Sequence, residues 1–97
     1  MILPWTWEAA SDREAIYNYI EADNPRAALE LDEQFSRRAG QLLSHPMIGR
    51  VGKVPSTREL VVRPNYILVY DMHGETIRIL RVLHAAQQWP PAKSEQQ

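Results

Sequence analysis

The spacing of the apolar residues changes once along this 97-residue chain, and that change limits the folds open to it. Between residues 25 and 43 apolar side chains recur every three or four positions, at Ala28, Leu31, Phe35, Ala39, Leu42 and Leu43. From residue 57 onward they form short runs separated by turn residues. The first pattern predicts an amphipathic helix of about five turns, and the second predicts strands. The chain is therefore expected to combine helices with a sheet.

Two helices are expected in succession. Asn24-Pro25 joins a capping residue to a first-turn proline, which marks the start of the longer helix. A shorter helix precedes it, with Thr6 as the preferred cap and Ser11 as the alternative. With Thr6 as the cap, one stripe of this helix holds Ala9, Arg13, Ile16, Tyr17 and Ile20. The short break between the helices indicates an antiparallel hairpin.

The N-terminus has the alternation of a strand. Leu3, Trp5 and Trp7 alternate with Pro4 and Thr6, which predicts a half-buried strand over residues 2–7. Pro4 lacks an amide donor, so this strand is expected at the edge of the sheet or at a strand start. Both tryptophans are then expected to pack in the core or at its rim.

The second half of the chain supplies three more strands. They are predicted over residues 57–63, 66–72 and 76–84, and turn residues separate them. The segment 45–56 holds two prolines and two glycines and is interpreted as a structured loop. The order β-α-α-β-β-β predicts an α+β fold in which a helical hairpin packs on one face of a small, mostly antiparallel sheet. We expect a single domain over residues 1–92 and a polar tail over residues 93–97.

Charge is divided between the two halves of the chain. The net charge is −1, which argues against a strongly basic nucleic-acid binder. Residues 1–48 hold eight acidic and four basic side chains, a balance of −4. Residues 49–97 hold four acidic and seven basic side chains, a balance of +3. The division indicates either two binding faces or two solvated surfaces of different sign.

Several classes of protein are not indicated. The chain has no cysteine, and therefore no disulfide scaffold and no thiolate chemistry. It has no apolar run long enough for a membrane helix and no secretory leader, so the expected compartment is the cytoplasm, with no membrane partner. It has no glycine-rich phosphate loop, nucleophile elbow or zinc-binding helix motif. No cofactor and no metal are expected.

Basic side chains gather on or beside the predicted sheet. They are Arg50, Lys53, Arg58, Arg63, Arg78 and Arg81, with His84 at the end of the last strand. Guanidinium groups bind phosphate and histidine transfers protons near neutral pH, so this set is compatible with cleavage of RNA. Solvated strand positions are the alternative interpretation. For Arg81 that alternative is neutralisation by an acidic helix residue, Asp12 or Glu14.

Strand alternation constrains any such site. It predicts that one face of the last strand holds Ile77, Ile79, Arg81 and Leu83, and that the other holds Arg78, Leu80, Val82 and His84. Arg81 and His84 can then line one site only if a bulge or the strand end intervenes. Trp89, in a proline-flanked tail, is expected to cover the sheet edge or to contact a partner.

The ordered set of motifs resembles the RelE/ParE superfamily of bacterial type II toxins over nearly the whole chain. The motifs are Asn24-Pro25 with Ala27-Ala28, His45 to Arg50, Thr57 to Val62, Tyr66 to Tyr70 and Ile79 to His84. The resemblance implies a toxin that is inactive in complex with a cognate antitoxin, and a toxin-antitoxin hetero-oligomer is the expected form of that complex.

The superfamily divides in mechanism, and both mechanisms stay open here. RelE-like and YoeB-like members cleave mRNA on the ribosome, and that resemblance would give catalytic roles to Arg58, Arg63, Arg81 and His84. ParE-like members inhibit DNA gyrase. The arginine of the central strand in YoeB-like enzymes would fall at Ile67, and the resemblance is nearer to the ParE-like members. Arg50, Lys53 and Trp89 are the expected contacts with target or antitoxin, and an inactive member that only binds antitoxin is the third possibility.

Overall fold

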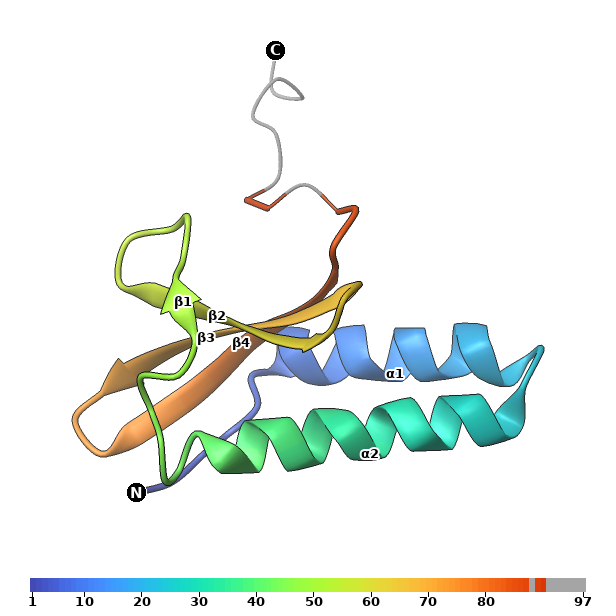
Figure 1. Cartoon of the computed structure of the whole chain (residues 1–97), viewed down its shortest axis with the longest axis horizontal. Helices are drawn as coiled ribbons and strands as arrows, with labels where there is room; N and C mark the ends of the chain where they lie inside the picture. Colours follow the sequence, from blue (N-terminus) through green and yellow to red (C-terminus); the bar gives the residue numbers. More distant parts are fainter. Residues whose placement is uncertain (88, 91–97) are drawn as a thin grey trace, which may run out of the picture.

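Two helices and four strands follow one another in a computed structural model, which describes residues 1–87, 89 and 90. The elements are α1 (Trp7–Glu21), α2 (Pro25–Gln41), β1 (Arg50–Val51), β2 (Thr57–Arg63), β3 (Tyr66–His73) and β4 (Thr76–His84). The helices lie side by side on one side of the sheet (Figure 1). The α+β prediction, with a helical hairpin on a small sheet, is confirmed. The predicted tail, residues 93–97, lies outside the described residues.

Both helix starts follow from the local sequence. The Thr6 hydroxyl accepts a hydrogen bond from the Ala9 amide at 3.1 Å, which confirms Thr6 as the cap of α1. The Asn24 side chain accepts from the Ala27 amide at 3.1 Å, and Pro25 occupies the first turn of α2. Neither helix, in the part of the chain that is described, is long and apolar enough to cross a membrane.

The four strands form an antiparallel sheet in the order β1-β2-β3-β4. Its helix-facing side, here called the inner face, contributes rows of paired residues such as Leu60, Leu68 and Val82 to the core. Those strand residues pack with Ala9 of α1 and with four residues of α2, namely Leu31, Phe35, Ala39 and Leu42. The opposite side of the sheet, the outer face, carries no helix (Figure 1).

The expected N-terminal strand is wrong in its extent. Only Ile2 and Trp5 form isolated parallel bridges with β4, to Thr76 and Ile79. Pro4 has no amide donor, and the cap at Thr6 turns the chain into α1 directly afterwards. Trp7 therefore starts a helix instead of ending a strand, and its side chain is 79% exposed. The expected packing of Trp7 is wrong, whereas Trp5 packs against the core.

The segment between α2 and β2 contains a strand that sequence periodicity did not predict. Arg50 pairs with Glu59 and Val51 pairs with Arg58, so β1 forms one edge of the sheet. Two residues are too few to produce a detectable alternation. This short strand brings the loop residues Arg50 and Lys53 to the outer face.

A bulge in β4 overturns the predicted division of its faces. Arg81 pairs with Val69 and Ile79 pairs with Tyr70, so Leu80 has no partner on β3. Ile79 lies in the core before the bulge and Val82 lies in the core after it. Arg81 therefore lies on the opposite face from Ile79, whereas simple alternation placed both on one face. Arg81 and His84 lie on opposite faces, as the alternation predicted.

Candidate functional site

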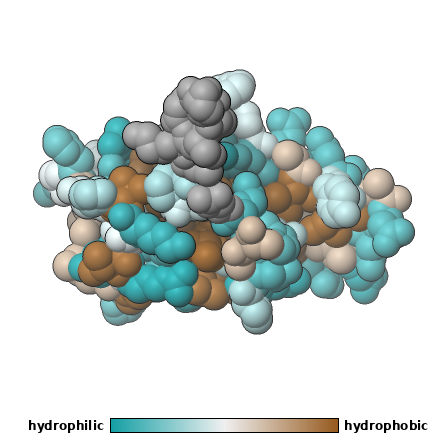
Figure 2. All heavy atoms as spheres, turned by 90° about the horizontal axis from the view of Figure 1, so that it is seen from above, coloured by the Kyte–Doolittle hydropathy of each residue, from teal (hydrophilic) through white to brown (hydrophobic). Residues whose placement is uncertain are grey.

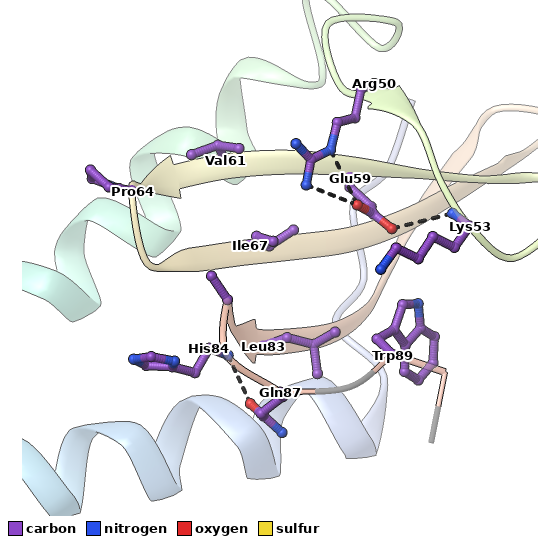
Figure 3. A pocket seen from close by; sticks show the side chains of 11 residues that line it. Arg50, Lys53, Glu59, Val61, Pro64, Ile67, Leu83, His84, Gln87 and Trp89 are labelled. Carbon is purple, nitrogen blue, oxygen red and sulfur yellow. Dashed lines mark hydrogen bonds and ion pairs between the residues drawn. The ribbon is translucent and has the colours of Figure 1, made fainter. Parts of the chain in front are cut away.

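The outer face of the sheet holds a cavity of about 310 Å³. Its floor is apolar and consists of one row of paired residues, Val61, Ile67 and Leu83. Its rim includes Arg50 and Lys53 from the β1 segment (Figure 3). Seen from this side, hydrophobic residues reach the surface between hydrophilic ones (Figure 2). An apolar hollow with a charged rim suits a peptide or protein segment better than a small polar substrate.

A buried carboxylate, that of Glu59, holds the rim in place. Its side chain is 7% exposed and accepts from the Arg50 guanidinium at 3.1 Å and from the Lys53 backbone amide at 3.3 Å. The Gly52 amide donates to the Thr57 carbonyl oxygen at 2.8 Å, which closes the turn between β1 and β2. The Lys53 side chain itself is exposed. Glu59 therefore fixes the backbone of the segment and leaves the Lys53 ammonium to the solvent.

Arg81 lies beside the cavity and is bound to α1. Its guanidinium donates to both carboxylate oxygens of Asp12, at 2.7 and 3.0 Å, and this hydrogen bond raises the pKa of Arg81. One of the two expected acidic partners is thus confirmed. The Asp12 carboxylate also accepts from the Val82 amide at 3.0 Å, at the open edge of β4. Arg81 and Asp12 together join the last strand to the first helix.

Trp89 returns to the sheet from the C-terminal segment. Its ring lies 5.6 Å from the Arg81 guanidinium carbon and lines the cavity at the end away from Val61 (Figure 3). Its indole nitrogen is buried and has no hydrogen-bond acceptor among the described residues. A buried donor without an acceptor is uncommon in native proteins, and it needs a structural or functional explanation.

The other three candidate catalytic residues hold structural contacts. Arg58 donates to the Gly49 carbonyl oxygen at 2.7 Å, and Arg63 donates to the Gln34 side chain on α2. His84 accepts from the Ala86 amide through Nδ1 at 3.0 Å, and its ring lies edge-on to Tyr66. Each side chain therefore has a role in holding the fold together.

These residues do not form one cluster. Arg63 and His84 occupy one row at the end of the sheet, on either side of Tyr66, which contacts Phe35 of α2. Arg58 lies in the row of Tyr70, several residues away along β2. Arg81 lies on the outer face. The structure thus brings together two of the four residues, Arg63 and His84, and it brings Arg50, Lys53 and Trp89 to one cavity, which His84 also lines.

Sequence reasoning missed the floor of the cavity and the central role of Glu59. The signal for the floor was present, because Val61, Ile67 and Leu83 are apolar residues on strand faces that the helices do not cover. The signal for Glu59 was a single carboxylate inside the otherwise apolar and basic strand β2. A lone acid in such a strand indicates a charge partner close by.

Comparisons with known proteins identify the family of this chain. Residues 3–89 match the family described as "ParE toxin of type II toxin-antitoxin system, parDE". The chain is 39% identical to Y4kP of Sinorhizobium fredii, a protein named as a candidate toxin, over 89% of this chain and 90% of that one. It is 36% identical to Toxin RelE2 of Caulobacter vibrioides, over 86% and 93%.

A solved structure agrees with these relatives. It is described as the chromosomal ParDE TA system from P. aeruginosa, and its chain superposes with a TM-score of 0.78. The two chains are 28% identical, and the match covers 87% of this chain and 95% of the other. The two-helix and four-strand arrangement is thus shared with a chain of that system.

Proposed function

This chain belongs to the ParE toxins of type II toxin-antitoxin systems, within the RelE/ParE superfamily, and from that premise we propose that it inhibits DNA gyrase. The proposal makes it a protein that acts by binding, with no catalytic step of its own. A cognate antitoxin neutralises it by forming a hetero-oligomeric complex with it.

The main support for the proposal is that the four candidate catalytic residues do not lie together in the structure. RNA cleavage needs a proton acceptor, a proton donor and phosphate-binding cations within reach of one phosphodiester. The Arg81 guanidinium is bound to Asp12, whereas the His84 ring packs edge-on to Tyr66 at the end of β4, where His84 also lines the end of the cavity. Arg58 is bound to a backbone carbonyl and Arg81 to a carboxylate. This arrangement favours structural roles for these residues.

The outer face supports binding as the activity. Ile67 is the second residue of β3, at the position where an mRNA-cleaving relative would carry an arginine, and it forms the floor of the cavity with Val61 and Leu83. Apolar floors surrounded by polar rims are typical of protein interfaces. We propose that Arg50, Lys53 and Trp89, at the rim of this cavity, contact the target or the antitoxin.

Ribosome-dependent mRNA cleavage is the second candidate function. One observation favours it: Arg63 and His84 flank Tyr66 in a single row at the end of the sheet. A cation, an aromatic ring and a histidine side by side could bind and cleave an unstacked nucleotide. The near-zero net charge argues against it, because the ribosomal site is strongly anionic.

Induction of the toxin in growing cells separates the two functions. The proposal predicts gyrase-dependent DNA breaks and a DNA damage response, with transcripts that stay intact in primer extension. Transcript cuts at fixed codon positions, lost in His84→Ala, would contradict it. Trp7→Phe serves as the matched control, because Trp7 is exposed at the start of α1 and lies outside the cavity.

A further inference from the structure

We infer that Trp89 is a recognition residue of the outer-face cavity, and that its indole N–H donates to a carboxylate of the antitoxin which Lys53 also binds. The inference rests on the proposed function, because it takes the antitoxin as the occupant of the cavity. It adds a specific atom and a specific ligand chemistry.

The indole nitrogen of Trp89 lacks a hydrogen-bond partner in the part of the chain that the structure describes. Trp89 Nε1 is buried, and no acceptor for it exists among residues 1–87, 89 and 90. Burial of a donor without an acceptor weakens the packing that buries it, because the hydrogen bond to water is lost without replacement. The Arg81 guanidinium carbon lies 5.6 Å from the centre of the ring. The indole N–H is therefore a group to which a partner can supply the missing acceptor.

The cations around the cavity differ in whether they are paired. The two neighbouring arginines are already engaged, Arg50 with Glu59 and Arg81 with Asp12. Lys53 is exposed, and its ammonium has no ion-pair partner within the described part of the chain. Lys53 and Trp89 line the same cavity (Figure 3). A carboxylate is the group that can pair with an ammonium and accept from an indole N–H at once.

The floor of the cavity is apolar. Val61, Ile67 and Leu83 offer an apolar surface next to these two donors, in a space of about 310 Å³. Such a space accommodates a few side chains. The matching segment therefore carries an aspartate or glutamate close to a branched aliphatic residue.

A second copy of this chain fits the cavity less well than the antitoxin. The acidic side chains of the chain are concentrated in residues 1–48, which form the helical layer and its flanks. A copy that inserted its helical layer would leave its own cavity free for the next copy. Such a heterologous contact builds open chains instead of a closed pair. The antitoxin is consequently the occupant to which the inference commits.

The test is a calorimetric titration of the toxin with its cognate antitoxin, identified as the protein that restores growth on co-expression. In one toxin variant Trp89 is replaced by its benzothiophene analogue, which keeps the bicyclic ring and lacks the N–H. A second variant is Lys53→Gln. Each is expected to weaken antitoxin binding about 10-fold or more, as for a hydrogen bond to a charged group. Trp7→Phe, the matched control, is expected to bind with unchanged affinity.

Substitution of each antitoxin Asp or Glu by its amide then identifies the carboxylate. One such change is expected to weaken binding to the wild-type toxin, and to have no further effect on either toxin variant. Urea unfolding of the free variants checks that they are folded. Because the analogue removes only the unpartnered donor, its free form is expected to be at least as stable as the wild type.

Unchanged antitoxin affinity in both toxin variants would overturn the inference. The inference would also be overturned if every Asp or Glu substitution in the antitoxin changed the binding affinity by the same factor in the wild-type toxin and in both toxin variants. Concentration-dependent self-association that the analogue abolishes, with antitoxin affinity retained, would make a second copy the occupant and would also overturn it. None of these results depends on gyrase, so failure of the gyrase proposal would be seen separately.

Discussion

The Arg81 Nε and Asp12 Oδ2 atoms lie 2.7 Å apart and join the last strand to the first helix. Asp12 also accepts from the Val82 amide, at the edge of β4 that no other strand covers. The two side chains are 28% and 18% exposed. One carboxylate thus neutralises a cation and satisfies a backbone donor at the edge of the sheet.

Asp12→Ala is expected to lower the free energy of unfolding by roughly 2 kcal/mol, because it leaves a half-buried guanidinium and a backbone amide unpaired. Urea unfolding measures the change. Asp71→Ala is the matched control, since it breaks an ion pair with Arg78, whose side chain is 49% exposed against 28% for Arg81. Equal losses in the two variants would contradict a special role for Asp12.

A pair of glycine substitutions tests how closely the 45–49 segment packs on the sheet. A Cβ at Gly49 would lie 2.6 Å from Tyr70 Cε1 and 3.0 Å from the Glu59 carbonyl oxygen. Gly49→Ala is expected to cost roughly 2 kcal/mol of unfolding free energy, since the Tyr70 ring is fully buried. A Cβ at Gly40, in α2, meets nothing within 4 Å.

Gly40→Ala is accordingly expected to gain about 0.5 kcal/mol through lower backbone entropy in the unfolded chain. Thermal unfolding of both variants compares them directly. Stabilisation by Gly49→Ala would mean that the segment does not pack on Tyr70 in this way.

Tyr70 is expected to make stability fall at alkaline pH. Its hydroxyl accepts from the Gly49 amide at 3.0 Å and donates to the Pro46 carbonyl oxygen at 2.7 Å. Burial raises the pKa of Tyr70 in the folded chain. The stability that this neutral hydroxyl contributes is present below about pH 10, the usual tyrosine pKa, and is lost as pH rises through the raised value.

Urea midpoints of wild type and Tyr70→Phe, compared from about pH 8 to about pH 11, isolate this contribution. The wild type is expected to lose stability more steeply than the variant. At neutral pH the variant is expected to be less stable by about 1–3 kcal/mol, because the Gly49 amide is left without an acceptor. Parallel pH profiles would refute the role given to the Tyr70 hydroxyl.

The sequence predicted most of the fold because long periodic segments carry their own signals. The cap at Asn24 and the limits of β2 and β4 were visible in the local chemistry of caps and turns. The predictions were wrong at positions where tertiary contacts determine the local structure. Trp7 followed the Thr6 cap into a helix, and the two residues of β1 are ordered only by pairing with β2.

The candidate site was predicted less completely than the fold. The bulge at Leu80 depends on the register of β3 and β4, which no pattern in one strand encodes. Simple alternation therefore assigned Arg81 to the wrong face. The pairing of Arg81 with Asp12 was one of the alternatives that the charges indicated, with Glu14 as the other possible partner. The apolar floor of the cavity emerged only from the arrangement of three strands around it.

His84→Ala is expected to leave growth inhibition unchanged, because the His84 ring contacts Tyr66 and the Ala86 amide and has no catalytic role in this account. Colony counts after induction measure the effect, and circular dichroism checks that the variant is folded. A folded variant with abolished toxicity would favour the nuclease.

A supercoiling assay with purified toxin, gyrase and relaxed plasmid shows directly whether this toxin binds and inhibits DNA gyrase. We expect loss of supercoiling with increasing toxin, accumulation of gyrase-linked broken DNA, and recovery when the cognate antitoxin is added. Full gyrase activity at every toxin concentration, together with toxin-dependent mRNA cuts in a purified translation reaction, would contradict the proposal of gyrase inhibition.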